Sequence, residues 1–391
     1  MMTMKILAAL LITFSLVQAA DRRQVLAAAE RMKTDERIAY LEKLSASDAT
    51  FRSALAAAFM QKLRETGDIA YLSRASAVLD KAPQSLQTDR LRLQIEMQMH
   101  HFPMVAEKAF ALLQKEPSDA TTLGLLGDSM MELGRYKEAG DAYHRMAALG
   151  GNMFSFNRLA YYEFVTGHPE NALGWMAQAI SAGSPAPENQ AWCLSEMGDM
   201  LLKTGRETDA KQAYQWALKI FPGYHRAHAG MGRLLAAQGD SAGAIENLKA
   251  AQSVVPLPEY AGQLEVLLEK KGDREGAARQ RALMVTIEKL ASANGETANR
   301  TLALIYADAG RNLEHALTLA KAEFAVRNDV YSYDALSWVL FKLNRIEEAR
   351  QASEKAMALK TPEPMFREHA RMIEAAMADR ASNAEPVVSR P

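Results

Sequence analysis

A repeat of about 34 residues is the feature that most constrains how this chain folds. Six glycines separate segments with helical patterning, at steps of 33, 38, 34, 33 and 38 residues: Gly134, Gly167, Gly205, Gly239, Gly272 and Gly310. One step before the first glycine stands His101, and one step after the last stands Asn344. A single requirement accounts for all eight positions. Each is predicted to lie just past a helix end with a positive φ, which Gly adopts freely and Asn or His tolerates.

A series of alanines keeps the same register. They follow the turn positions by five or six residues: Ala106, Ala139, Ala172, Ala210, Ala244, Ala277, Ala316 and Ala349. A small side chain at this point lets two helices of one pair approach closely. Because a single short pair cannot bury its apolar face, the pattern predicts helix–turn–helix units stacked into an array.

The composition favours helix over sheet and argues against nucleic acid. Apolar residues make up 49% of the 391 residues, and Ala and Leu outnumber the β-branched types. Lys and Arg number 46 against 47 Asp and Glu, which gives a formal net charge of −1. Without a basic excess to hold a phosphate backbone, no nucleic-acid partner is expected.

The N-terminus has the pattern of a secretory signal peptide over residues 1–19. A short basic segment precedes the apolar run 6–17, and small residues then allow cleavage after Ala19 or, as a second choice, Ala20. The run is short for a membrane span, so no stable span is expected after cleavage. We therefore expect an exported protein, periplasmic or secreted and not cytoplasmic. An uncleaved N-terminal anchor remains the alternative.

No recognisable catalytic motif is present, and the chain is not expected to be an enzyme. Cys193 is the one cysteine, so no internal disulfide can form, and we interpret it as a small core residue. His225 and His228 can share a helix face, but two histidines without a third ligand make a weak metal site. We therefore expect no metal, no cofactor and no catalytic residue.

The repeat resembles the tetratricopeptide repeat. The clearest unit reads Gly198, Gly205, Ala210, Tyr214, Ala217 and Pro222, where that family has a small residue, a turn glycine, an alanine, an aromatic, an alanine and a proline. The next unit has Gly232, Gly239, Ala244, Leu248, Ala251 and Pro256 at the same places. Two departures stand out. Glu265 occupies a small-residue position in one unit, and Asn312 is an extra residue in the turn that contains Gly310.

The resemblance implies an all-α fold, a right-handed α-solenoid of helix–turn–helix repeats. About eight to nine repeats are expected over residues 51–376. Residues 20–50 are expected to form N-terminal capping helices, and residues 377–391 a disordered tail.

The resemblance also implies a concave groove lined by the first helix of each pair. Carrying over the family's groove positions gives candidate partner-binding residues of mostly aromatic, arginine and small polar type. They are Phe154, Asn157, Tyr161, Phe164, Trp192, Ser195, Asp199, Arg226, Arg233, Tyr331, Asp334 and Trp338. Aromatic and arginine side chains anchor interfaces, and Arg226 with Arg233 could bind an acidic group. Alternatively, some of these rings pack between successive helices.

The function expected from this pattern is a non-catalytic scaffold or adaptor that binds a peptide or protein in the groove, in the bacterial envelope. Two alternatives stay open. The array could self-associate as a structural solenoid, or it could be an accessory subunit of a separate enzyme or transport complex.

Overall fold

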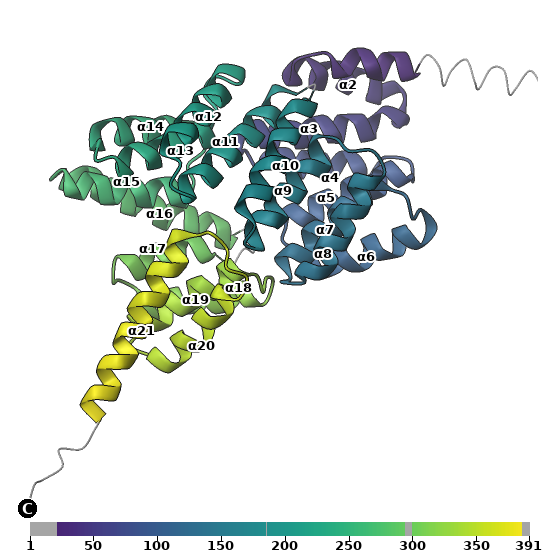
Figure 1. Cartoon of the computed structure of the whole chain (residues 1–391). Coiled ribbons are helices and arrows are strands. Elements are labelled where there is room, and N and C mark those ends of the chain that lie inside the picture. The colour runs from purple at the N-terminus through teal and green to yellow at the C-terminus, as the bar shows by residue number, and fades with distance from the viewer. Residues whose placement is uncertain (1–21, 185, 294–298, 385–391) are drawn as a thin grey trace, which may run out of the picture. The chain divides into compact units, whose positions relative to one another are not determined.

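The computed structural model describes residues 22–184, 186–293 and 299–384, which form helices joined by turns and loops, with no strand among them (Figure 1). The all-α solenoid expected from the sequence is confirmed, since consecutive helices pack in adjacent pairs. The proposed signal peptide lies outside the described residues. No helix in the described ranges is both long and apolar enough to span a bilayer.

The chain divides into two units, of which the first ends at Ile95. In it, a helix over residues 22–30 is followed by further short helices around a core that includes Leu41, Leu55, Phe59 and Leu79. Their bounds are α2 Thr34–Ser47, η1 Ala49–Phe51, α3 Arg52–Thr66, α4 Ala70–Leu79 and α5 Leu86–Gln98.

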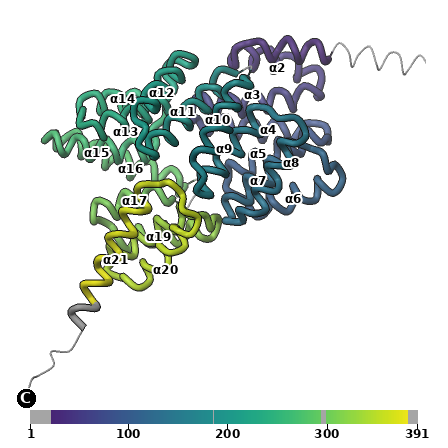
Figure 2. The backbone as a smooth tube through the Cα atoms, in the orientation of Figure 1, coloured from purple at the N-terminus to yellow at the C-terminus, as the bar shows by residue number. Residues whose placement is uncertain are grey.

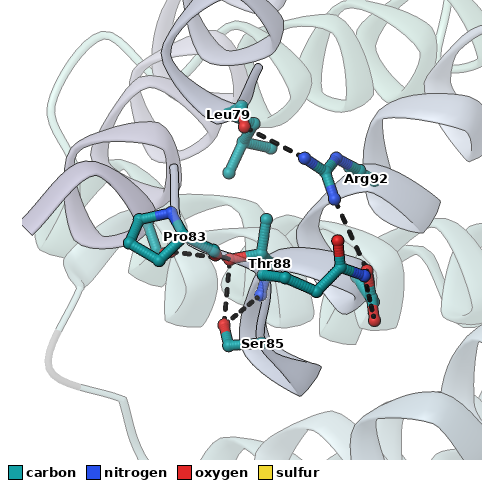
Figure 3. A network of polar contacts seen from close by, with 8 residues as sticks. Leu79, Pro83, Ser85, Thr88 and Arg92 are labelled. Atoms are coloured by element: carbon teal, nitrogen blue, oxygen red, sulfur yellow. Dashed lines mark hydrogen bonds and ion pairs between the residues drawn. The ribbon is translucent and has the colours of Figure 1, made fainter. Parts of the chain in front are cut away.

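Helix α5 begins at a polar cluster centred on Thr88, which is fully buried (Figure 3). The Thr88 backbone N–H donates to Ser85 Oγ at 3.1 Å, and its hydroxyl donates to the Pro83 carbonyl at 2.8 Å. Arg92, one turn further along, donates to the Leu79 carbonyl at the end of α4 at 3.1 Å. Because the first N–H groups of a helix have no partner within it, these contacts fix where α5 starts and tie it to α4.

The second unit runs from Glu96 onward and holds the regular repeats, whose path can be followed in Figure 2. After α6 (Phe102–Lys115) the helices alternate as the first and second members of successive pairs. The first helices are α7 Ala120–Glu132, α9 Met153–Val165, α11 Pro187–Lys203, α13 His225–Ala237, α15 Pro258–Lys270, α17 Arg300–Asp308 and α19 Val330–Lys342. The second helices are α8 Tyr136–Ala148, α10 Pro169–Ala182, α12 Glu207–Ile220, α14 Ser241–Val254, α16 Arg274–Ala293, α18 Leu313–Phe324 and α20 Ile346–Met357.

The predicted turn positions have the backbone conformation that the repeat requires. All six turn glycines have positive φ, as does Asn344 at 62°. The extra turn residue Asn312 is also left-handed, with φ 52°. At the first turn the prediction was off by one residue: His100 has φ 62°, whereas His101 has φ −83° and precedes α6 as its N-cap.

Small residues of the first helices face large residues of the second helices, as the repeat pattern predicts. A Cβ at Gly198 would overlap the Tyr214 ring, and one at Gly232 would overlap the Leu248 side chain. The alanine after each turn is also enclosed: Ala210 is fully buried. The close approach of the two helices therefore depends on these small residues.

The C-terminal boundary differs from the prediction. Helix α21 spans Pro364–Ala384, so residues 377–384 continue a helix instead of belonging to the expected tail. The helix continues because this stretch is rich in good helix formers and contains no Gly or Pro before Pro386. Residues 385–391 lie outside the described part of the chain.

Candidate functional site

Charged clusters line the first helices of the repeats, and the clearest one is centred on Asp199 of α11. Its carboxylate accepts a hydrogen bond from the Tyr214 hydroxyl at 2.5 Å and one from Arg233 at 2.6 Å. Burial by itself would raise the pKa of Asp199, but Arg233 and the Tyr214 hydroxyl hold that pKa below its ordinary value. The cluster thus links α11, α12 and α13 across two repeats.

An equivalent cluster lies two repeats earlier, on α7. Asp128 accepts hydrogen bonds from the Tyr143 hydroxyl at 2.9 Å and from two nitrogens of Arg158, each at 2.8 Å. Arg158 belongs to the next first helix, α9. The repetition shows that an acidic residue just after the small residue of a first helix serves to join neighbouring repeats.

Glu265 of α15 replaces the small residue of its repeat, and a buried ion cluster replaces the usual packing. Its side chain is 5% exposed and accepts hydrogen bonds from Arg281 at 2.9 Å and, through its second oxygen, from Arg311 at 2.6 Å. Burial opposes ionisation, yet the two guanidinium groups lower the pKa of Glu265. Arg281 stands where Leu248 stands in the preceding repeat, so both members of the small–large pair have changed together.

A cavity of about 850 Å³ opens on the faces of three consecutive first helices, α13, α15 and α17. Its lining is mostly apolar, with Val266, Leu304 and Ile305 among the aliphatic side chains. Val266 is 63% exposed, which is unusual for a large aliphatic residue between two packed repeats. Met365 at the start of α21 completes the apolar part of the lining. The cavity thus lies on the first-helix face of three consecutive repeats and extends to the start of α21.

The first-helix face further toward α9 and α11 is instead in contact with the C-terminal repeats of the same unit. Lys203 at the end of α11 forms an ion pair with Glu363 at 2.7 Å, and the Thr361 hydroxyl donates to the Val165 carbonyl at 2.6 Å. Burial disfavours the charge on Lys203, but Tyr331 and Glu363 hold its pKa above the usual range. These contacts join residues about 160 to 200 positions apart in the sequence.

The turn before α19 makes a second contact of this kind. The backbone N–H of Asn328 donates to the Glu132 carbonyl at 3.0 Å, and Arg327 lies 3.0 Å from the Glu132 carboxylate. The backbone N–H of Val330 donates to the Tyr136 hydroxyl at 2.8 Å. The turn glycine Gly134 leaves room for this approach, because a Cβ there would overlap the Asn328 carbonyl.

The structure places five of the candidate groove residues at least partly at the surface of α9, α11 and α13. Phe154 is 46% exposed, and Trp192 is half-buried against the cores of two repeats. Tyr161 is half-buried, and Asn157 lies 4.0 Å from the Cys193 sulfur. Arg226 is exposed and lies 3.6 Å from Glu196. Whether these residues bind a partner stays a prediction.

Four other candidates are enclosed and make internal contacts. Phe164 is 2% exposed, and the Ser195 hydroxyl donates to the Ala191 carbonyl within its own helix. Asp334 and Trp338 both contact His369, whose ring stacks on the indole with centroids 4.0 Å apart. In this arrangement their side chains do not reach the surface.

The remaining three candidates form internal pairs. Asp199 and Arg233 bind each other, and Tyr331 packs edge-on against Phe366 with ring centroids 5.2 Å apart. Arg226 and Arg233 thus each already face a carboxylate of the chain, on Glu196 and Asp199 respectively. Sequence reasoning did not identify Lys203, Glu363 or the cavity around Val266, because these depend on how successive repeats are rotated.

The cysteine and the two neighbouring histidines are surrounded by contacts within the fold. Cys193 is fully buried, and burial raises the pKa of its thiol to about 12, so the reactive thiolate form is disfavoured at neutral pH. His225 is hydrogen-bonded to the Tyr260 hydroxyl at 2.8 Å, and burial lowers its pKa to about 4. His228 faces Asn247 instead. Among the described residues no group of three His, Cys, Asp or Glu side chains could hold a metal ion.

Family models for the tetratricopeptide repeat match residues 196–261 and residues 330–361. These segments contain the Asp199 cluster and the pair α19 and α20, in the register described above. The chain is a tetratricopeptide-repeat protein. Proteins with this fold are in general non-catalytic scaffolds for protein–protein interaction, and no catalytic family is indicated. A search of curated protein sequences found no match.

Solved structures similar to this tetratricopeptide-repeat protein share its fold at low sequence identity. The APC/C hetero-tetramer Cut9–Hcn1 matches with a TM-score of 0.51 and 13% identity, over 88% of this chain. This chain spans 60% of the length of that one. The human IFIT1 dimer with m7Gppp-AAAA matches with a TM-score of 0.52 and 14% identity, over 88% of this chain and 87% of that one. At such identities the likeness concerns the fold alone.

Proposed function

We propose that this tetratricopeptide-repeat protein is a non-catalytic adaptor that holds a segment of a protein partner in the cavity between α13, α15 and α17. The observation that carries the proposal is the cavity itself: about 850 Å³, on the first-helix face, with aliphatic lining and Val266 63% exposed. An exposed apolar surface inside a concave site marks a binding position in general.

The position differs from that of the groove candidates carried over from the family, most of which lie on α9, α11 and α13. Around α9 and α11, part of the first-helix face is occupied by Thr361 and Glu363 of the chain itself. The open part begins at Arg233, the last of the central candidates, and extends to Arg311. The proposed site therefore lies one to two repeats further along the array.

Affinity capture tests this proposal with residues 20–391 as bait against an extract of the source cells. Three baits are compared: the natural sequence, Val266→Asp, and a control, Trp216→Asp. Trp216 is 50% exposed on the second helix α12, outside the cavity. Partners retained by the natural and control baits and lost from Val266→Asp would support the site, provided that circular dichroism shows equal helicity. The same partners on all three baits would refute it.

We further propose that the protein acts after export, in the bacterial envelope. The support is the N-terminal pattern, a basic start followed by the apolar run 6–17 and small residues at Ala19. N-terminal sequencing of the protein isolated from its source should begin at Ala20. A chain that retains Met1 and remains with the cytoplasmic fraction would contradict export.

A further inference from the structure

The cavity between α13, α15 and α17 has more acidic than basic groups in its lining. The carboxylates are those of Glu259, Glu265, Glu269 and Asp308, and the cations are Arg233 and Arg311. Arg281, outside the lining, binds Glu265 and Glu269, so in the described part of the chain the carboxylates that a ligand meets without a bound guanidinium are those of Glu259 and Asp308. The balance matters more here than on an open surface, because the walls of a concave site limit screening by water.

Both arginines are already paired. Arg233 donates to Asp199 at 2.6 Å, and Arg311 donates to Glu265 at 2.6 Å. A carboxylate on a ligand would therefore compete with Asp199 or Glu265 for these guanidinium groups. Because charge-assisted hydrogen bonds of this length are the strong ones, the cavity is poorly suited to an acidic ligand.

Two of the carboxylates keep the capacity to accept more hydrogen bonds. Asp308 is exposed and accepts one hydrogen bond through Oδ1, from the Trp338 indole at 2.7 Å. Glu259 lies in the field of Arg226 and Arg233 on α13. Within the described residues, however, no hydrogen bond or ion pair within 4.0 Å engages Glu259. These carboxylates stand on α15 and α17, the helices that also carry the aliphatic lining.

The apolar lining is carried by the same two helices as these acidic groups. Val266 and Ile305 belong to α15 and α17, and Ile305 packs so closely over Gly262 that a Cβ there would overlap it. The absence of a side chain at Gly262 thus brings the aliphatic surface of α17 up to α15. A bound segment could bury an apolar side chain here while its flanking groups reach the carboxylates.

We infer that the segment bound in this cavity is cationic: a peptide with an apolar side chain against Val266 and Ile305, and Lys or Arg side chains beside Glu259 and Asp308. The inference rests on the proposed function and names its class of partner. It also reverses the expectation that Arg226 and Arg233 bind an acidic group.

A phage library of random 12-residue peptides, selected on purified residues 20–391, tests the inference. The enriched peptides should carry an excess of Lys and Arg next to an apolar residue. Their dissociation constants, measured by fluorescence anisotropy on synthetic copies, should rise about tenfold in the double variant Glu259→Gln with Asp308→Asn, the effect of two partly desolvated ion pairs. The Asn at 308 can still accept from Trp338, so folding should be retained.

A matched variant outside the cavity controls for net charge. Glu275→Gln with Glu368→Gln also removes two carboxylates, which are 87% and 56% exposed, and it should leave the affinity unchanged. Enrichment of acidic or uncharged peptides, or no enrichment, would overturn the inference. Selected peptides could also lose affinity in Val266→Asp but keep it in the double variant Glu259→Gln with Asp308→Asn. That result would overturn the inference and leave the proposed function standing.

Discussion

Replacing Glu265 with Gln tests whether an ion cluster holds this repeat together. The carboxylate is 5% exposed and bound by Arg281 and Arg311, which are 36% and 28% exposed. Gln keeps the shape but removes the charge and places an N–H₂ group against a guanidinium. We expect the free energy of unfolding to fall by about 2–3 kcal/mol, the range for losing charged hydrogen bonds in a mostly buried pair. Urea denaturation followed by circular dichroism measures the loss.

The pH dependence gives a second test of the same cluster. The pKa of Glu265 is lowered in the folded chain, so the stability it contributes is present above its unfolded pKa and is lost as the pH falls through the folded value. The difference between the natural sequence and Glu265→Gln should therefore be constant from neutral pH down to about 5 and shrink at lower pH. A difference independent of pH would refute the ion-cluster account.

Restoring the small–large pair provides the matched control. Glu265→Gly alone should destabilise the chain, whereas Glu265→Gly with Arg281→Leu recreates the Gly232 and Leu248 pair of the preceding repeat. The double variant should recover part of the lost stability, since apolar packing commonly replaces buried ion pairs without loss. If the double variant is no more stable than the single one, the two positions are not coupled as described.

Three further predictions concern the packing of the repeats. Gly198→Ala should lower stability by about 1–3 kcal/mol in urea denaturation, because the new Cβ overlaps Tyr214; no change would refute the register. Gly205→Ala should lower the free energy of unfolding by about 1 kcal/mol, because φ is 81° there. Gly174→Ala, in open space within α10, should raise it by a similar amount. Changes of the same sign in the two variants would contradict the turn assignment. Cys193 should react with a thiol reagent only after unfolding, because it is buried with its pKa raised to about 12; fast labelling of the native chain would contradict its core placement.

The sequence predicted the repeat register because the register depends on local requirements. A positive φ at each turn and a small residue where two helices meet leave direct marks, such as Gly205 and Ala210. The first turn was misplaced by one residue, since His100 and His101 are the same type and spacing alone does not separate them. The repeat register also locates the large residue opposite Glu265, because Arg281 falls at the repeat position of Leu248.

The position of the open cavity could not be predicted in the same way. It depends on the rotation between repeats, which accumulates over many helices and brings Lys203 to Glu363 and Glu132 to Arg327. The groove positions carried over from the family assume that every first helix faces open space. The structure shows that Phe164, Ser195 and Trp338 do not, and that the open surface instead surrounds Val266.

The central claim, that a partner binds between α13, α15 and α17, is tested most directly by site-specific photocrosslinking in the source cells. A photoreactive amino acid replaces Val266 in one strain and Trp216 in another. The account predicts a crosslinked partner, identified by mass spectrometry, from position 266 and not from position 216. Equal crosslinking at both positions, or a crosslink from 266 only to a second copy of this chain, would contradict it.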